Sequence, residues 1–412
     1  MFNRSRSVYS SRRQAQKSAL KPAHSRGGGS SRYGGGGQGR RGGRGENINT
    51  SRFINKTAVN CSVEQFVPTH KFADFQIDET LKKAIIAKGY VTPTPIQDVA
   101  IPHILKGEDL MGIANTGTGK TGAFLIPLIN KVRLDRKQQV LIIAPTRELA
   151  IQIDSELKGF TAGMKIYSVC VVGGMSIGRQ ISELRYQYNF IIGTPGRLKD
   201  LINRGMIHLS EFNTVVLDEA DRMLDMGFID EMRFVMAGMP KERQTLFFSA
   251  TLSPTIEKLI GEFLRIPIRV SVKKGDTAKN VDQDVVRIQK GENKFSVLYD
   301  LLTKKEFCKV LVFGRTKSGV EKLSGMLVGK GIKAESIHGN KNHVQRQRAL
   351  GKFKENHAQV LVATDVAARG LDIADISHVI NYDIPQTYDD YVHRIGRTGR
   401  GDKQGKALTF IE

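Results

Sequence analysis

Short apolar runs separated by stretches with helical spacing dominate the chain after about residue 66. A run of roughly four to eight apolar residues between turn residues is typical of a strand that is buried on both faces. Strands that alternate with helices predict a parallel sheet covered by helices on both sides. In the first part of the chain the runs are Leu110–Ala114, Val140–Ala144, Ile166–Val172, Phe190–Ile192, Val215–Leu217 and Leu246–Phe248.

A second alternation of the same kind follows a polar and charged segment. We interpret this segment, residues 273–283, as a linker between domains at 66–272 and 284–412. Two domains agree with the length of 412 residues, which exceeds what one hydrophobic core usually serves. The strand candidates of the second domain are Val310–Phe313, Val360–Ala363, Val379–Ile380 and Ala407–Ile411.

Two local patterns precede the first strand. Leu81, Ile85 and Ile86 predict a helix that ends at Gly89. The strip Tyr90–Gln97 follows, and we expect its two prolines to hold it extended. The Gln97 amide would then offer a donor and an acceptor together, which is what the edge of an adenine base requires.

Residues 1–60 differ from the rest in composition and charge. They contain thirteen Lys/Arg and one Glu, and this difference of +12 is more than half of the net +22 of the chain. The segment is rich in Arg, Gly and Ser, so it cannot bury enough apolar surface to offset chain entropy, and we expect a disordered RGG-like tail. Arg among Gly, with Tyr9 and Tyr33, suits loose binding of phosphates and bases. A solubilising linker is the alternative.

Several classes of protein are disfavoured by what the sequence lacks. Cys61, Cys170 and Cys308 have no Cys or His partners at ligand spacing, which argues against a disulfide framework or a zinc site. The sequence contains no apolar run of 18 residues and no secretory leader pattern. We therefore expect a soluble, cytoplasmic protein that does not interact with membranes.

The clearest chemical signal is a glycine-rich loop between an apolar run and a helical stretch. Backbone N–H groups of such a loop at a helix N-terminus can surround one phosphate, while a lysine reaches the outer phosphates and a hydroxyl binds Mg²⁺. This pattern predicts a site for a nucleoside triphosphate, with a chance Gly-Lys-Thr as the alternative. The loop consists of Ala114, Asn115, Thr116, Gly117, Thr118, Gly119, Lys120 and Thr121.

Acidic residues follow the run Val215–Leu217, where the carboxyl end of a parallel strand would place them beside the loop. We expect Asp218 to hold Mg²⁺ opposite Thr121, and Glu219 to orient and deprotonate the attacking water. These acids could instead cap the next helix, a position that also favours carboxylates.

With these motifs in place, the chain from about Phe72 onward resembles the DEAD-box ATP-dependent RNA helicases. The resemblance implies two RecA-like domains in tandem, the P-loop NTPase helicase core, with ATP and Mg²⁺ as cofactors. Phe72 would stack near the adenine, and Gln97 would read the base. In this family the loop commonly begins with Ala, as at Ala114.

Further motifs in both domains receive roles only from this resemblance. Ser249 and Thr251 would couple hydrolysis to strand separation, Asp372 would lie near the ribose, and Arg397 and Arg400 would reach the γ-phosphate. Without the resemblance, the two arginines could simply hold their own domain together through carboxylates. The residues expected to contact RNA are Thr146, Arg147, Gly174, Thr194, Arg197, Arg315 and Thr364.

Two positions depart from the family pattern. His343 replaces the usual Gln of a Gln-x-x-Arg element, and Asn340 replaces the Asp that usually follows His338-Gly339. Arg346 keeps the other half of the element and can contact either a phosphate or the network between the domains.

The resemblance predicts an ATP-dependent RNA helicase in which RNA stimulates ATP hydrolysis. Its expected partners are single-stranded RNA, short RNA duplexes or RNA–protein complexes, with the chain acting as a monomer. Two alternatives stay open: an ATP-gated RNA clamp that seldom unwinds, and an RNA chaperone that acts mainly through its basic tail.

Overall fold

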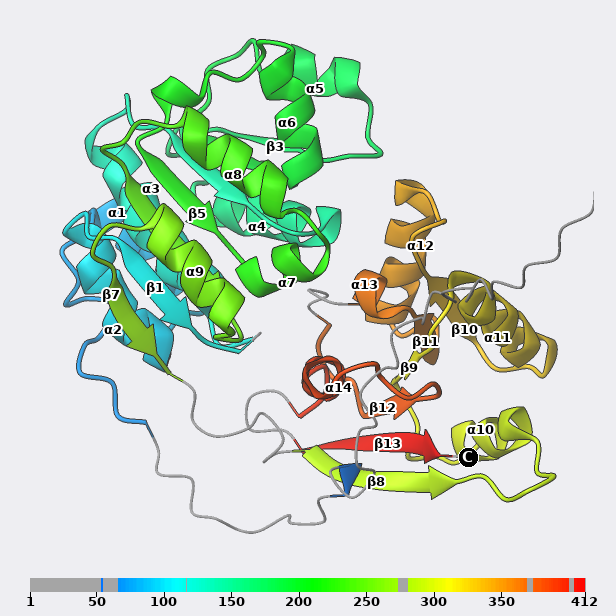
Figure 1. The fold of residues 1–412 in the computed structure, drawn as a ribbon. Helices are drawn as coiled ribbons and strands as arrows, with labels where there is room; N and C mark the ends of the chain where they lie inside the picture. The colour runs from blue at the N-terminus through cyan, green and yellow to red at the C-terminus, as the bar shows by residue number, and fades with distance from the viewer. Residues whose placement is uncertain are drawn as a thin grey trace, which may run out of the picture. The chain divides into compact units, whose positions relative to one another are not determined.

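Two parallel β-sheets organise the chain, as the alternating runs predict. The structure is a computed structural model that describes residues 53–54, 66–115, 117–272, 281–368, 373–399 and 404–411. The first sheet has seven strands in the order β3-β4-β2-β5-β6-β1-β7, and the second has six in the order β10-β11-β9-β12-β13-β8. Figure 1 shows both sheets with their helices. We call residues 66–272 the first lobe and residues 281–411 the second lobe.

The strands of the first sheet are four to six residues long and mostly buried. The edge strand β7 was not predicted because Arg269 interrupts its apolar residues. The bounds are β1 (Leu110–Ile113), β2 (Val140–Ile143), β3 (Ser168–Val171), β4 (Phe190–Gly193), β5 (Thr214–Leu217), β6 (Gln244–Ser249) and β7 (Ile268–Ser271).

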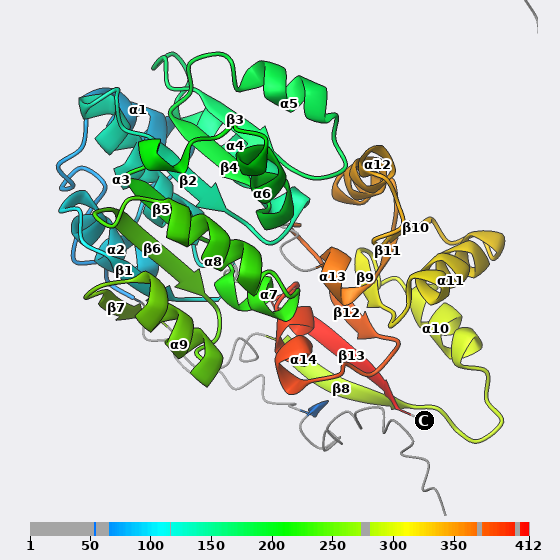
Figure 2. The same ribbon diagram turned by 45° about the horizontal axis from the view of Figure 1, so that its top comes forward.

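Each face of this sheet carries its own hydrophobic cluster, because successive side chains of a strand point to opposite faces. In β2, Val140 and Ile142 join one cluster, whereas Leu141 and Ile143 join the other. Figure 2 shows α8 and α9 in front of β5 and β6. The first cluster includes residues of α1 (Glu79–Ala87), α2 (Pro95–Leu105), α3 (Lys120–Leu134) and α4 (Arg147–Phe160); the second includes residues of α6 (Pro195–Asn203), α7 (Ala220–Asp225), α8 (Ile229–Gly238) and α9 (Pro254–Phe263). Helix α5 (Ile177–Glu183) follows β3, and the short helix η2 (Leu209–Glu211) precedes β5.

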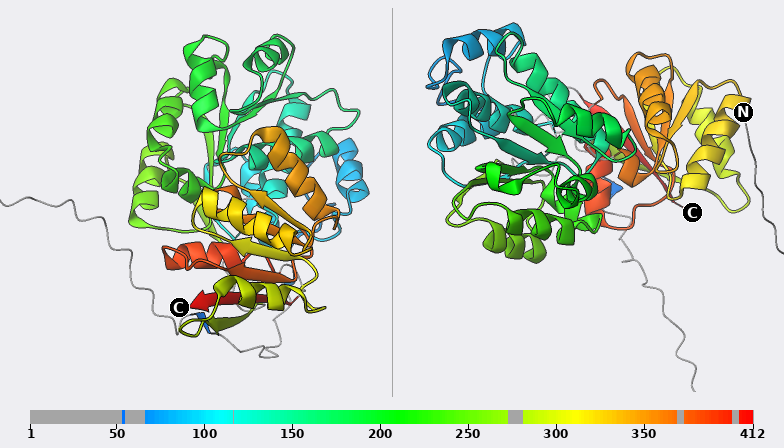
Figure 3. Two further views of the ribbon diagram at one scale, coloured as in Figure 1. Left: turned by 90° about the vertical axis from the view of Figure 1, so that its right-hand side faces the viewer. Right: turned by 90° about the horizontal axis from the view of Figure 1, so that it is seen from above.

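The second lobe repeats this arrangement around a smaller sheet. Helices α10 and α11 share a cluster with Val310 and Val312, and α12 and α13 share one with Leu311 and Phe313. Figure 3 shows these helices from two further directions. The bounds are β8 (Val281–Arg287), β9 (Val310–Phe313), β10 (Ala334–Ile337), β11 (Val360–Ala363), β12 (His378–Asn381), β13 (Gly405–Ile411), α10 (Lys294–Leu302), α11 (Lys317–Gly329), α12 (His343–Lys354), α13 (Asp365–Ala368) and α14 (Tyr388–Ile395).

Two predicted boundaries are wrong. Strand β8 begins at Val281, so residues 281–283 of the predicted linker belong to the second sheet, while residues 273–280 lie outside the described ranges. Polar residues alternate along this edge strand, which is why it resembles a linker in sequence. The strip Tyr90–Gln97 is also not extended throughout, because α2 begins at Pro95. Proline is favoured at the first position of a helix, where its missing N–H has no partner to lose.

The predicted disordered tail needs one correction. Phe53 is fully buried and belongs to a hydrophobic cluster of the second lobe. Apart from Phe53 and Ile54, residues 1–60 lie outside the described residues. Within the described ranges, no helix is both long enough and apolar enough to cross a membrane.

Candidate nucleotide and RNA site

The predicted chemical motifs of the first lobe lie at the carboxyl ends of three neighbouring strands. Strand β6 lies between β5 and β1, with Leu217 beside Phe247 and Ile113 beside Ser249. Asp218 follows β5, Ser249 is the last residue of β6, and Ala114 follows β1. The Ala114 N–H donates to the Ser249 carbonyl at 3.0 Å. Ligands of open parallel sheets bind at this end of the strands. The sheet therefore brings the separate motifs together.

The phosphate loop ends in a buried lysine with no hydrogen-bond partner. Gly119 precedes α3 with φ +90°, a value that favours glycine, and Lys120 is the first residue of the helix. The Lys120 side chain is 7% exposed, and its Nζ makes no hydrogen bond with the part of the chain that is described. A buried ammonium without a partner is costly, so this site fits an anion. Thr116 lies outside the described residues, and Thr121 follows Lys120 in the helix.

Gln97 supports the same loop from α2. Its side chain is 1% exposed, its Nε2 donates to the Gly119 carbonyl at 3.0 Å, and its Oε1 accepts from the Thr94 N–H at 3.0 Å. A Cβ at position 119 would lie only 2.6 Å from Nε2, so this contact requires glycine. A primary amide has two donors and two acceptor sites, which leaves one of each for a base. The predicted adenine partner Phe72 is buried, edge-on to Phe75 and Tyr90 at centroid distances of 6.0 and 5.9 Å.

Asp218 and Glu219 are both buried but differ in charge environment. Burial, with a further contribution from the charge of Glu219, raises the pKa of Asp218 to about 6 despite the opposing charge of Lys120. Burial also acts to raise the pKa of Glu219, but the charges of Arg222, Lys120 and Arg397 outweigh it and the pKa falls below its usual value. Glu219 is therefore ionised at neutral pH. Its φ of +50° is unusual for a side-chain-bearing residue and is the kind of strain found at functional sites.

The donor set fits Mg²⁺ bound together with a nucleotide. Asp218 is 2% exposed and one of its oxygens accepts the Glu219 N–H at 3.0 Å. Among the described residues, no group of three or more His, Cys, Asp or Glu could hold a metal. Mg²⁺ in phosphate-transfer sites commonly uses one or two protein carboxylates together with water and phosphate oxygens. Asp218 and the Thr121 hydroxyl supply the protein ligands that such a site needs.

Asp221, for which no role was predicted, connects the acidic loop to the Ser249–Thr251 segment. One oxygen of its carboxylate accepts from the N–H groups of Ala250 and Thr251 at 3.0 and 2.9 Å and from the Thr251 hydroxyl at 3.1 Å. The Ser249 hydroxyl donates to the Thr251 carbonyl at 2.7 Å. A third acid so close to Asp218 was visible in the sequence, but only the fold shows what it binds. A displacement of the acidic loop can therefore be transmitted to Thr251 through the Asp221 carboxylate.

Arg222 also lacked a prediction, and it contacts both lobes. Its Nη1 pairs with the Glu219 carboxylate at 3.1 Å, and its Nη2 donates to the Val366 carbonyl in α13 at 2.7 Å. Arg397 is 3% exposed, and its charge is among those that lower the pKa of Glu219. The second lobe therefore contributes positive charge near the predicted catalytic carboxylate. Arg400 and Asp372 lie outside the described residues.

Arg394, three residues before Arg397, has a structural role. Its Nε and Nη2 donate to the two oxygens of Asp365 at 2.6 and 2.8 Å, and its Nη1 donates to the Asp383 carbonyl at 2.6 Å. The guanidinium also lies 5.0 Å from the centre of the Phe313 ring. Arg394, for which no role was predicted, therefore holds its own domain together through a carboxylate, which is the role that the alternative gave to Arg397 and Arg400.

The predicted RNA-contacting residues of the first lobe lie beyond the ends of β2, β3 and β4. Thr146 and Thr194 are the N-cap residues of α4 and α6. Gly174 has φ +76°, and a Cβ there would lie 1.9 Å from the Arg147 Nη1, so the guanidinium rests against the glycine backbone. The Nη1 of Arg197 donates to the Gln180 side chain at 2.9 Å. The structure brings these five predicted residues to one end of neighbouring strands.

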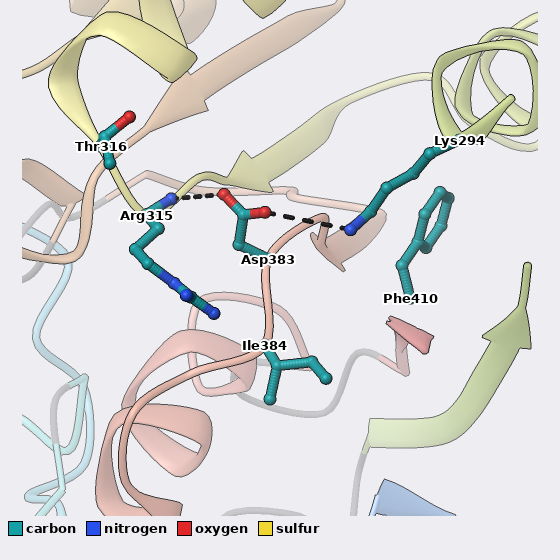
Figure 4. Close-up of a pocket in the computed structure, with 6 residues that line it drawn as sticks. All are labelled: Lys294, Arg315, Thr316, Asp383, Ile384 and Phe410. Carbon is teal, nitrogen blue, oxygen red and sulfur yellow. Dashed lines mark hydrogen bonds and ion pairs between the residues drawn. The ribbon is translucent and has the colours of Figure 1, made fainter. Parts of the chain in front are cut away.

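In the second lobe, Arg315 lines a pocket of about 440 Å³ (Figure 4). Its backbone N–H donates to Asp383 Oδ2 at 2.7 Å, and the Lys294 Nζ lies 3.9 Å from the other oxygen of the same carboxylate. Thr316, beside it, caps α11. The predicted contact Thr364 follows β11, next to β9 in the sheet, and is 8% exposed. Asp383 thus fixes the loop that carries Arg315 at the same end of the sheet as Thr364.

The element that departs from the family pattern joins the lobes. Arg346 Nη2 pairs with Glu148 Oε2 at 2.7 Å, and both side chains are almost fully buried. Two partners were predicted for Arg346, a phosphate and the network between the domains, and this contact supports the second. His343 begins α12, and Asn340 donates its N–H to the His338 ring at 3.3 Å.

The chain is similar to known proteins over both lobes. Residues 94–259 match the family model of the DEAD/DEAH box helicases, and residues 293–402 match that of the helicase conserved C-terminal domain. The chain is 47% identical to the ATP-dependent RNA helicase CshA of Listeria monocytogenes over 83% of its own length and 66% of that protein. It is 48% identical to the DEAD-box ATP-dependent RNA helicase CshA of Bacillus subtilis, over 83% of its length and 70% of that protein.

A solved structure agrees with these matches. The structure of S. cerevisiae Dbp5 bound to RNA and ADP BeF3 is 31% identical and has a TM-score of 0.73, covering 83% of this chain and 89% of that one. The chain spans about two thirds of the length of the curated relatives it matches.

Proposed function

Because the chain belongs to the DEAD-box family of ATP-dependent RNA helicases, we propose that it hydrolyses ATP with Mg²⁺ when RNA is bound. The hydrolysis would drive local separation of short RNA duplexes or remodelling of RNA–protein complexes. The protein would act as a monomer on single-stranded segments, in a cytoplasmic setting. The basic residues of its N-terminal tail would add affinity for RNA without sequence preference.

One observation carries this proposal: a buried, unpartnered ammonium lies near buried carboxylates that follow a neighbouring strand. Lys120 Nζ has no hydrogen-bond partner within the described ranges. Its charge opposes the rise that burial causes in the pKa of Asp218, and it contributes to the lowered pKa of Glu219. A structural ion pair would show a direct contact. An ammonium held short of its carboxylates, at a helix N-terminus, leaves room for phosphate oxygens and a cation between them.

The residues of this chain would divide the chemistry among them. Lys120 and the loop N–H groups would bind the phosphates, and Asp218 with Thr121 would hold Mg²⁺, which neutralises charge on the phosphate oxygens. Glu219 would orient the attacking water and accept its proton, although its low pKa makes it a weak base, so orientation would be the larger part of its role. Arg397 would stabilise charge developing on the γ-phosphoryl group.

Replacement of Glu219 by Gln tests this assignment. We expect ATP and RNA affinities close to those of the parent while steady-state ATP hydrolysis falls by about two powers of ten or more, because the base is lost and the metal site is kept. Affinities would be measured by fluorescence anisotropy beside phosphate release. Glu257→Gln, an exposed glutamate at the start of α9, is the matched control and should retain parental turnover. Near-parental hydrolysis by Glu219→Gln would contradict the assignment.

A further inference from the structure

The aromatic side chain of Phe53, one of the two described residues before Phe66, is buried in the second lobe. Phe53 stands thirteen positions before Phe66, where the description of the first lobe begins, yet it is 0% exposed. Its ring lies 4.6 Å from the ring of Tyr391, with the two planes tilted by 51°. Val281, Ile395 and Ala407 complete the cluster of buried residues. We call this the Phe53 cluster.

The host of Phe53 is a surface at the edge of the second sheet. Strand β8 is the last in the strand order, β13 pairs with it, and α14 supplies Tyr391 and Ile395. Figures 1 and 2 both draw the short segment that contains Phe53 as a small blue piece beside β8. In the sequence this segment comes directly before the first lobe. In the structure, however, Phe53 contacts residues of the second lobe.

The polar groups of the host are satisfied, so its interior is built to receive an apolar side chain. The buried Tyr391 hydroxyl donates to Gln283 Oε1 at 2.9 Å, and Gln283 Nε2 donates to the Val281 carbonyl at 3.4 Å. Burial raises the pKa of Tyr391, which keeps the hydroxyl protonated as a donor. Ile54, the next residue along the chain, is 41% exposed. Of the two described residues of this segment, Phe53 is therefore the one that makes the buried contact.

We propose that Phe53 is an aromatic anchor that docks the N-terminal tail of this chain, in cis, on the second lobe. The 52 residues before the anchor contain twelve Lys/Arg and one Glu, a net charge of +11. Docking makes the second lobe the point from which these charges reach RNA. Burial of one phenylalanine corresponds to a docked-to-undocked ratio on the order of ten to a hundred. This ratio would keep Phe53 docked on the second lobe most of the time and still let it dissociate.

The anchor also gives the lobes a second connection beside residues 273–280, which is covalent at the first lobe and held by the packing of Phe53 at the second. The thirteen steps of chain from Phe53 to Phe66 can span at most about 45 Å. Docking thereby limits how far Phe66 can lie from the face formed by β8, β13 and α14. Since Arg397 follows α14 by two residues, the tail is attached beside the residue that, in the proposed function, would stabilise charge on the γ-phosphoryl group.

Fluorescence provides the direct test, because the natural chain contains no tryptophan. In Phe53→Trp the single indole should emit at shorter wavelength than in the matched variant Ile54→Trp, and acrylamide should quench it several-fold less efficiently. Equal quenching of the two variants, at the same folded fraction by circular dichroism, would overturn the anchor unless the larger indole is simply excluded. The next experiment decides that case.

The second experiment keeps the natural side chain and uses a labelled peptide of residues 47–58. The full-length Phe53→Ala chain leaves the host surface open, so it should bind this peptide at least about tenfold more tightly than the parental chain does, where the cis segment competes. A peptide with Ala at position 53 should bind neither chain. If the Phe53→Ala chain binds both peptides equally, the anchor is wrong.

The consequence for RNA rests on the proposed function. Phe53→Ala should weaken binding of single-stranded RNA by about threefold, with the same salt slope because every charge is retained, and the maximal RNA-stimulated ATPase rate should not change. Deletion of residues 1–52 should weaken binding further and reduce the salt slope. Parental affinity in Phe53→Ala, together with weakened binding in the deletion, would overturn the delivery role. No effect of the deletion would instead contradict the proposed RNA role of the tail.

Discussion

The two lobes share one architecture but contribute to the site in different ways. In the first lobe, the functional loops are held by contacts within the lobe: Gln97 fixes Gly119, and Asp221 fixes Thr251. In the second lobe, neighbouring residues of one motif have separate tasks. Arg394 is bound to Asp365, whereas Arg397 acts electrostatically on Glu219 of the first lobe. In the proposed function, the first lobe would therefore hold a preformed phosphate site, and the second lobe would supply the charge that completes it.

The largest expected effect comes from removing that charge. Arg397→Ala should lower ATP turnover at saturating RNA by about 10³-fold or more, the range known for arginine fingers, while ATP affinity changes little. Thermal unfolding should stay close to that of the parent. Arg287→Ala, an exposed arginine at the end of β8, is the control and should leave turnover unchanged. Parental turnover in Arg397→Ala, or a loss fully explained by unfolding, would contradict the proposal that the second lobe supplies this charge.

Arg394→Ala should produce the opposite phenotype, a loss of stability. Removal of one partner from a buried ion pair leaves an uncompensated charge and costs about 3–5 kcal/mol. We expect the second lobe to unfold at lower denaturant concentration and its amide hydrogens to exchange faster. Arg394→Lys should be intermediate, because an ammonium cannot bind both oxygens of Asp365 in parallel. If Arg394→Ala is as stable as the parent but inactive, the two arginines have been assigned the wrong way round.

The sequence predicted the repeated parts of this molecule well. Apolar runs identified six strands of the first sheet and four of the second, since strands buried on both faces are almost continuously apolar. The loop Ala114–Thr121 and the acids after β5 were placed together by topology alone. In contrast, the edge strands β7, β8 and β10 were not predicted, because each is partly exposed and its polar residues resemble loop composition.

Contacts between distant segments were beyond what the sequence could predict. Asp221 and Arg222 were visible as charged residues near Asp218, but their partners Thr251 and Val366 are about 30 and 144 positions away. Phe53 was included in a tail whose average composition suggests disorder, and a single aromatic residue does not change such an average. Only the fold shows that β8, β13 and α14 offer this side chain a buried position.

A smaller effect is expected from replacing Gln97, and it tests whether the nucleotide site of the first lobe is preformed. Gln97→Ala should lower the preference for ATP over GTP by about tenfold, because one base-reading amide contributes on the order of 1–3 kcal/mol when its partner would otherwise be unpaired. The variant should also bind ATP more weakly, since the support of Gly119 is lost. Turnover of both nucleotides would be measured over a range of concentrations. Equal use of ATP and GTP by the parent would refute base reading by Gln97.

The last expected effect concerns the pH dependence of the second lobe. His378 in β12 stacks on Phe307 at 4.0 Å, and burial, helped by the charge of Lys406, lowers its pKa from 6.5 to about 4. Between these values the unfolded chain binds a proton that the folded lobe does not, so stability falls as the pH falls from about 6.5 to about 4, by up to about 1.4 kcal/mol per pH unit. His378→Phe keeps the stack and removes the proton site, so its unfolding free energy should change less steeply over this interval. The exposed His357→Phe should follow the parent. Parallel curves for the parent and His378→Phe would show that this imidazole does not set the acid sensitivity of the second lobe.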